Sequence, residues 1–126
     1  MTVATLAAVA TGGAVGATAR YMVSGWVYAR FGDGFPTGTL AVNLIGCFFI
    51  GLVMEMTETR FLLPPAVKLF VTVGLLGGFT TFSTYSFETL ALLRAGAPGL
   101  ALLNGAGSLA LGLVGVWVGM VAGRGI

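Results

Sequence analysis

The sequence has no histidine, a single cysteine and few charged residues. Only 8% of its 126 residues are charged, whereas 57% are hydrophobic. Because Cys47 stands alone in an apolar run, Cys/His metal sites, disulfide frameworks and catalysis by a Cys–His pair are excluded. A chain with so few charged side chains cannot cover a water-soluble surface, so its composition predicts an integral membrane protein. The net charge of +2 is too small and too scattered to indicate nucleic-acid binding.

Four apolar segments long enough to cross a bilayer follow one another along the chain. A hydrocarbon core of about 30 Å needs about 20 apolar residues in helical form. The segments form one membrane domain, 1–126, and cover residues 3–28, 37–56, 65–93 and 99–122. Small residues repeat every four positions in the first and last segments, which indicates closely packed helices. The sequence therefore predicts an all-α membrane protein with four transmembrane helices and both termini on one side.

The third segment is too long for a single straight span. Its length of about 29 residues corresponds to about 43 Å of helix, against a core of about 30 Å, and tilt could absorb part of that excess. Gly77-Gly78 and the β-branched pair Thr80-Thr81 lie in its middle, and they predict two half-helices that meet near the midplane. Lipid cannot satisfy the backbone groups freed by such a break, so protein, a bound ion or water must do so. A broken polar helix at this depth indicates ion or solute handling.

Positive charges give the four spans almost no preferred orientation. The side that carries the termini has three basic residues near its span ends, and the opposite side has two; these are Arg60, Lys68 and Arg124 against Arg30 and Arg94. Orientation in a membrane follows the excess of Lys and Arg on one side. A near balance is expected of a chain that inserts both ways, and an antiparallel homodimer would then be natural.

Several uncharged polar residues lie inside the expected spans. Thr39 and Asn43 lie four residues apart on one face of the second helix, and Asn104 and Ser108 do the same on the fourth. Each needs a polar partner in hydrocarbon, so these residues either make interhelical hydrogen bonds or line a polar path. Interhelical bonding is the more ordinary role for the hydroxyls and Asn104. For Asn43 the polar path is the favoured role, because bonds to the local backbone satisfy a hydroxyl but not all the donors and acceptors of a side-chain amide.

Charged residues within or at the ends of the spans allow two roles. Arg20 lies about two-thirds along the first span, where it either anchors the helix at a membrane surface or attracts anions to a vestibule. Glu88 lies about two turns beyond the expected break, where it either pairs with a hydroxyl or with Arg94, or lines a path. Glu55 and Glu58 end the second span and are expected to be solvated.

Two aromatic residues follow the expected break. Phe82 and Tyr85 lie three residues apart, so their rings share one face of the second half-helix. Ring edges carry partial positive charge and can hold an anion in a narrow path. Aromatic residues in membrane helices more often serve packing, but the neighbouring Gly77-Gly78 pair and hydroxyl run favour a path here.

These residues closely resemble the signature of the CrcB/Fluc family, which are small bacterial fluoride channels. The matching runs are GGFTTFSTYSFE at residues 77–88, GTLAVNLIG at residues 38–46 and residues 16–20 of the first span. The first two runs together, at this spacing, form a highly specific pair. The length, the four spans and the weak charge bias agree as well, so the resemblance covers essentially the whole chain.

The resemblance implies an antiparallel, dual-topology homodimer with two fluoride pores in the bacterial inner membrane. Asn43 would donate to the permeating anion, and Phe82 and Tyr85 would present their ring edges to it. Further hydroxyls would come from Thr39, Ser83 and Ser108, Arg20 would lie at the entrance, and Glu88 matches an acidic position of the family. The backbone carbonyls of Gly77 and Thr80 from both subunits would hold a structural Na⁺ at the dimer centre.

Two positions depart from the family pattern. Tyr85 stands where familiar members carry phenylalanine, and its added hydroxyl is free to bond an ion or a neighbour. Asn104 stands where several members carry Tyr or His, so no pore role is transferred to it.

The predicted function is passive export of cytoplasmic fluoride, which lowers its toxicity. No nucleophile–base pair or cofactor motif indicates an enzyme. The alternative is a small multidrug-resistance-type dual-topology transporter, but that mechanism centres on a glutamate in the first span, and this span has no acidic residue. A scaffold subunit without transport would leave the hydroxyl and aromatic run unexplained.

Overall fold

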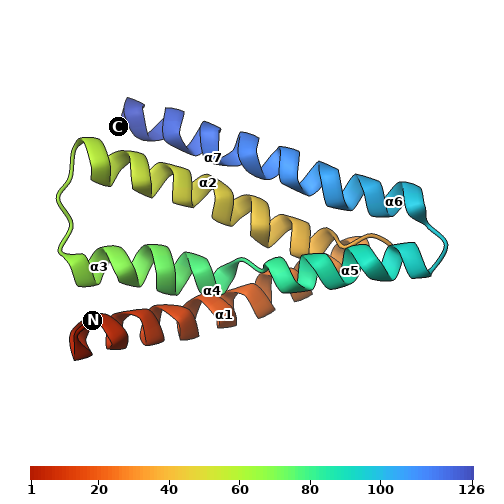
Figure 1. Ribbon diagram of the computed structural model, residues 1–126, viewed down its shortest axis with the longest axis horizontal. Helices are drawn as coiled ribbons and strands as arrows, with labels where there is room; N and C mark the ends of the chain where they lie inside the picture. The colour runs from red at the N-terminus through yellow and green to blue at the C-terminus, as the bar shows by residue number, and fades with distance from the viewer.

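The computed structural model describes all 126 residues as four long helical rods joined by short connections (Figure 1). The first rod is α1 (Val3–Phe31) and the second is α2 (Thr37–Thr59). The third comprises α3 (Pro65–Leu69), the π-helical η1 (Phe70–Leu76), α4 (Gly77–Phe79) and α5 (Phe82–Arg94). The fourth comprises α6 (Pro98–Leu102), the π-helical η2 (Leu103–Gly107) and α7 (Ser108–Gly125). Both termini lie at the same end of the molecule (Figure 1).

Three of the rods are long and apolar enough to cross a membrane by length and composition. They are Thr37–Thr59, Pro65–Arg94 and Pro98–Gly125. The first rod has 29 residues and contains more alanine than the others. The predicted all-α class with four long helices is confirmed.

The third rod is interrupted at Thr80 and Thr81, which confirms the predicted break. Thr80 has a ψ of 160°, and Thr81 has φ −149° and ψ 116°, so both residues are extended. The prediction placed the cause partly in Gly77-Gly78, and there it was wrong, because both glycines are helical. Gly78 instead permits contact with α1, since a Cβ at Gly78 would lie 2.7 Å from the Gly13 carbonyl oxygen.

Glycines also set the packing of the other rods. In α7, a Cβ at Gly119 would overlap the Phe48 carbonyl oxygen of α2. In α1, a Cβ at Gly12 would lie 2.5 Å from the Phe70 carbonyl oxygen at the start of η1. Membrane helices lack a hydrophobic drive for association, so close backbone approach supplies van der Waals contact. The small-residue repeats predicted these interfaces correctly.

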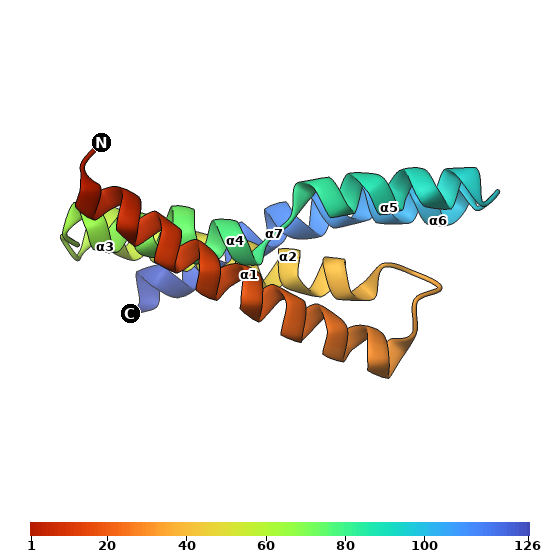
Figure 2. The ribbon, with the colours of Figure 1, turned by 90° about the horizontal axis from the view of Figure 1, so that it is seen from below.

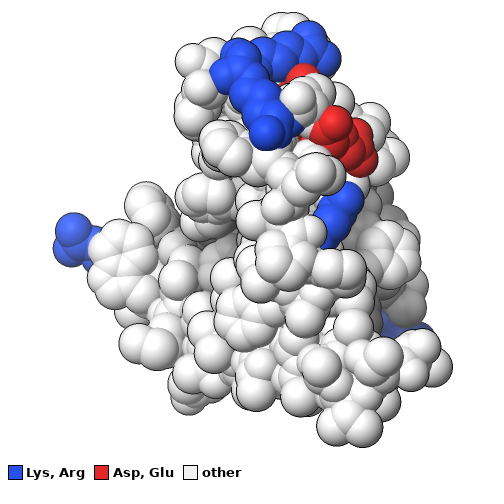
Figure 3. All heavy atoms as spheres, turned by 90° about the vertical axis from the view of Figure 1, so that its left-hand side faces the viewer, with Lys and Arg blue, Asp and Glu red and all other residues white.

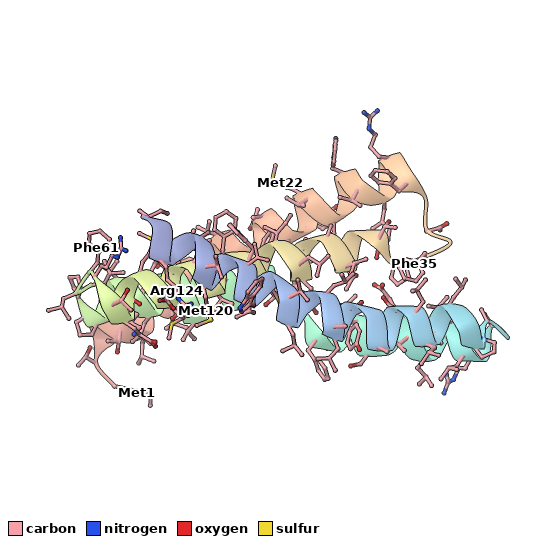
Figure 4. All side chains as sticks on the ribbon, turned by 90° about the horizontal axis from the view of Figure 1, so that it is seen from above. Met1, Met22, Phe35, Phe61, Met120 and Arg124 are labelled. Carbon is pink, nitrogen blue, oxygen red and sulfur yellow. The ribbon has the colours of Figure 1, made fainter.

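Beyond the break the four rods separate into two pairs. Figure 2 shows α5 and α6 running together, apart from the pair formed by the end of α1 and the start of α2. Few side chains are buried, and the hydrophobic ones are Val27, Val42, Phe79 and Ala101. Large apolar side chains cover the outside; Met22, for example, is 66% exposed and points away from α1 (Figure 4). Such a surface suits lipid or a second copy of the chain.

Charged side chains gather at the end that carries the termini (Figure 3). Glu55 was expected to be solvated, but it is buried and its Oε1 accepts from Arg124 Nε at 3.1 Å. The Arg60 guanidinium donates to the Arg124 carbonyl oxygen near the end of α7. Glu58 is exposed, as expected. Glu55 is buried because α7 approaches α2 closely at Gly123 and covers the Glu55 side chain.

Candidate ion pathway

Asn43 of α2 bonds both backbone groups of Thr81 at the break. Its Oδ1 accepts from the Thr81 N–H at 2.8 Å, and its Nδ2 donates to the Thr81 carbonyl oxygen at 3.1 Å. One side-chain amide thus replaces two helical hydrogen bonds that the break removes. The second hydrogen of Nδ2 has no protein acceptor, so Asn43 keeps one donor for a ligand.

The break releases the carbonyl oxygens of Gly77 and Thr80. In a continuous helix the Thr81 N–H would donate to Gly77 and the Thr84 N–H to Thr80. Here the Thr81 N–H donates to Asn43, and the Thr84 N–H donates to Thr81 Oγ1 at 3.3 Å. No hydrogen bond reaches the Thr80 carbonyl oxygen. Two carbonyl oxygens are therefore free of their helical donors, and such oxygens are the ligands that hard cations prefer.

Thr81 also begins the second half-helix. Its Oγ1 caps α5 through the Thr84 N–H and lies 3.0 Å from Thr84 Oγ1 and 3.5 Å from Ser83 Oγ. The first N–H groups of a helix have no intrahelical partner and carry partial positive charge. The amino end of α5 therefore offers hydroxyl and backbone donors next to the aromatic pair.

The aromatic pair lies on one face of α5, as predicted. The ring centroids of Phe82 and Tyr85 are 5.6 Å apart, and the ring planes are inclined by 41°. Phe82 is 79% exposed. The Tyr85 hydroxyl donates to the Gly105 carbonyl oxygen of η2 at 2.5 Å. Within this chain the Tyr85 hydroxyl thus bonds a neighbouring helix, and the edge of the Tyr85 ring remains available for an ion.

Asn104 makes an interhelical bond. This buried residue of η2 donates from Nδ2 to Thr89 Oγ1 at 2.8 Å, and its Oδ1 accepts from Ser108 Oγ at 3.2 Å. Thr89 in turn donates to the Tyr85 carbonyl oxygen at 2.7 Å. Together with the Tyr85 hydroxyl, these bonds tie α5 to the fourth rod, and α5 has no fully buried residue of its own.

A groove of about 470 Å³ collects most of the predicted pathway and metal residues. It runs between α2, the third rod and α7, and its exposed wall is mainly apolar, with residues such as Ile50 and Leu113. The predicted residues that line it are Asn43, Gly77, Thr80, Phe82, Tyr85 and Ser108. Ser83 is exposed next to Phe82 and does not line the groove.

The remaining predicted residues lie in a second cavity of about 250 Å³. Arg20, Thr39 and Glu88 line it, from α1, α2 and α5 respectively. Thr39 Oγ1 donates to Glu88 Oε1 at 2.8 Å, so Glu88 pairs with a hydroxyl and not with Arg94. Thr81 borders both this cavity and the groove. The cavity lined by Arg20 and the groove lined by Asn43 are therefore neighbours at the break, with Thr81 between them.

Two residues of the site were missed by the sequence reasoning. Thr81 was treated only as part of the break, although it pairs with Asn43 and caps α5. Tyr28 bonds Thr39 and Glu88 in the second cavity. One weak sign in the sequence is the glycine at position 38, at the start of the second span. A Cβ there would lie 2.5 Å from Tyr28 Cε2, so the glycine makes room for the Tyr28 ring.

Comparison with known proteins gives matches over nearly the whole chain. A family model described as CrcB-like protein, Camphor Resistance (CrcB), matches residues 7–120, a range that includes both cavities. The fluoride-specific ion channel FluC of Geobacter sulfurreducens is 52% identical over 120 residues, which cover 95% of this chain and 97% of that protein. The proteins of the same name from Acidobacterium capsulatum and Magnetococcus marinus are 48% and 50% identical, over 92% and 94% of this chain and 93% and 97% of their own lengths.

Proposed function

The chain belongs to the CrcB family of multi-pass membrane proteins, and we propose that it is a fluoride-specific ion channel through which cytoplasmic fluoride leaves passively. Its relatives are ion channels of that name and not enzymes. The observation that carries the proposal is that the cavity lined by Arg20 and the groove lined by Asn43, Phe82 and Tyr85 meet at one residue of the break, Thr81. Hydrogen fluoride crosses membranes as a neutral acid and dissociates inside, so an open fluoride path lowers its toxicity.

The pathway residues supply the donors that a small, tightly hydrated anion needs. Arg20 attracts fluoride to the entrance, and the hydroxyl of Ser83 and the amino end of α5 replace part of its water. Thr39 lines the same cavity as Arg20 and gives its hydroxyl proton to Glu88. The free hydrogen of Asn43 Nδ2 then donates to the ion. Further along, Phe82 and Tyr85 present ring edges. Ser108 lines the same groove and gives its hydroxyl proton to Asn104. Glu88 lies beside this route in the Arg20 cavity.

The functional unit is an antiparallel homodimer in this proposal. The groove and the 79% exposed Phe82 ring support it, because a second copy would complete a wall that one chain leaves unfinished. The near balance of Lys and Arg between the two sides lets both copies insert, in opposite orientations.

A structural Na⁺ at the dimer centre is part of the same proposal. The Gly77 and Thr80 carbonyl oxygens have lost their helical donors to Asn43 and to Thr81 Oγ1, so the available ligands fit a hard monovalent cation. Two copies would supply four such oxygens. The cation would offset the negative ends of the carbonyl dipoles and fix the two breaks against each other.

Ion efflux from liposomes tests the function. The purified chain is reconstituted with internal potassium fluoride, external potassium isethionate and valinomycin, and a fluoride electrode follows release. We expect rapid fluoride efflux and, in parallel liposomes loaded with chloride, no release above that of protein-free vesicles. Absence of fluoride efflux, or chloride release at a comparable rate, would refute the proposal.

A further inference from the structure

The carboxylate of Glu88 is held by hydroxyl groups from two other helices. Thr39 Oγ1 of α2 lies 2.8 Å from Glu88 Oε1. The Tyr28 hydroxyl oxygen of α1 lies 3.3 Å from Oε1 and 3.2 Å from Oε2. The three residues thus join α1, α2 and α5 at the side of the cavity that Arg20 also lines.

The protons in this cluster can be assigned, because each hydroxyl has only one. Thr39 donates its hydroxyl proton to Glu88 over the shortest distance. Tyr28 then donates its own proton to Glu88, and its oxygen accepts from the Thr39 backbone N–H at 3.4 Å. The Tyr28 and Thr39 hydroxyl oxygens lie 3.1 Å apart, and neither has a proton left to donate to the other. The carboxylate therefore receives two donors, and Tyr28 bonds both partners.

The cluster lies at the amino end of α2. Thr39 is the third residue of that helix, and its N–H has no intrahelical partner. Pro36, the residue before the helix, supplies no side-chain cap. Tyr28 takes that place, and only glycine at position 38 leaves room for its ring. The partial positive charge of a helix amino end also stabilises the Glu88 carboxylate nearby.

A carboxylate beside an anion path repels the ion unless its charge is dispersed. We propose that Tyr28 is a positioning residue that holds the Glu88 carboxylate against the amino end of α2, so that fluoride meets the positive charge of Arg20 and not the negative charge of Glu88. The proposal rests on the channel function above. Without the Tyr28 hydroxyl, Glu88 keeps one donor and turns into the cavity.

The test compares fluoride efflux of the full chain with that of Tyr28→Phe and Tyr28→Phe/Glu88→Gln in liposomes. Loss of one charge-assisted hydrogen bond is expected to slow efflux by about tenfold in Tyr28→Phe. Removing the freed charge in the double variant should restore at least half of the lost rate. Thr18→Ala is the control, because Thr18 lies on the same helix, is exposed, lines neither cavity and bonds only the Ala14 carbonyl oxygen of its own helix.

A second readout does not depend on conduction. Hydrogen exchange of the peptide that contains Thr39 should be faster in Tyr28→Phe than in the parent, since the Thr39 N–H loses its acceptor. Unchanged efflux in Tyr28→Phe, or a double variant no faster than Tyr28→Phe, would overturn the proposal. Should the parent chain itself conduct no fluoride, the channel function fails, and exchange then decides separately: faster exchange supports the holding role of Tyr28, and unchanged exchange refutes it.

Discussion

At the scale of single residues, Asn43 shows both what spacing predicts and what it misses. Its position in a membrane helix, with more donors and acceptors than local backbone can satisfy, identified it as a site residue. Its partner could not be predicted, because Thr81 lies 38 positions away and contributes only backbone groups. Tyr28 was missed for a related reason, since its hydrogen bonds join three helices whose relative placement a sequence does not give.

Asn43→Ala is expected to lower stability and abolish fluoride efflux together. It leaves the Thr81 N–H and carbonyl without partners at membrane depth, and each unsatisfied group costs about 1–3 kcal/mol. It also removes the free amide hydrogen from the groove. Thermal unfolding in detergent and liposome efflux measure the two effects. A matched control is Thr57→Ala, whose hydroxyl bonds only the carbonyl oxygen of Met54 in its own helix. Normal melting and normal efflux in Asn43→Ala would contradict this account.

Tyr85→Phe is expected to distinguish the contribution of the Tyr85 hydroxyl from that of its ring. The hydroxyl donates to Gly105, so its loss should lower the free energy of unfolding by about 1 kcal/mol. Fluoride efflux should stay within about twofold of the parent, because the ring edge remains. Melting temperature and efflux rate are measured on the same preparation. A large loss of efflux at unchanged stability would mean that the hydroxyl contacts the ion.

At the scale of helices, the break in the third rod was predicted, and its position was predicted in part. The length of the segment suggested an interruption, although α1 covers 29 residues without one. The break lies at Thr80 and Thr81, one of the two pairs that the sequence offered. The glycine pair looked like its cause, yet Gly78 serves close packing against Gly13, and the chain becomes extended two residues later. In membrane helices glycine can either interrupt the helix or allow close packing, and which of the two applies depends on the neighbouring helix. The π-helical stretches η1 and η2 also left no sequence signal, because a shift in bonding register needs no special composition.

Gly78→Val should separate α1 from the third rod. A Cβ would lie 2.7 Å from the Gly13 carbonyl oxygen, and backbone on both sides cannot yield cheaply. The expected result is a loss of about 1–3 kcal/mol in unfolding free energy, seen as a lower midpoint in thermal or denaturant unfolding. The control is Gly13→Ala, where a new Cβ meets nothing within 4 Å. Equal midpoints for Gly78→Val and the parent would show that the two helices do not pack closely here.

At the scale of the whole molecule, one chain looks incomplete. Its surface is mainly apolar, its groove contains the proposed ion donors, and two carbonyl oxygens at the break lack helical donors. Composition and segment count predicted a four-helix membrane protein, and the charge balance suggested two orientations. The sequence could not place a second copy, because complementarity between two surfaces depends on side-chain packing that only a structure describes.

Removing Na⁺ should destabilise the proposed dimer. A cation that binds only the assembled state raises its stability in proportion to the logarithm of its concentration. Replacing sodium by N-methylglucamine at constant ionic strength is therefore expected to lower the melting temperature and to shift the purified protein toward monomer in size-exclusion chromatography with light scattering. Lithium and potassium serve as size controls. Identical melting and assembly in sodium and N-methylglucamine would contradict a structural Na⁺.

The central claim is selective conduction of fluoride, and a reversal potential tests it most directly. The purified chain is inserted in a planar bilayer with a tenfold fluoride gradient and equal chloride on both sides. The account predicts a current that reverses at about 59 mV in magnitude, which is the equilibrium potential of a monovalent ion for a tenfold gradient. The current should also keep that reversal when chloride alone is changed. A reversal that follows chloride, or no fluoride current at all, would contradict the account.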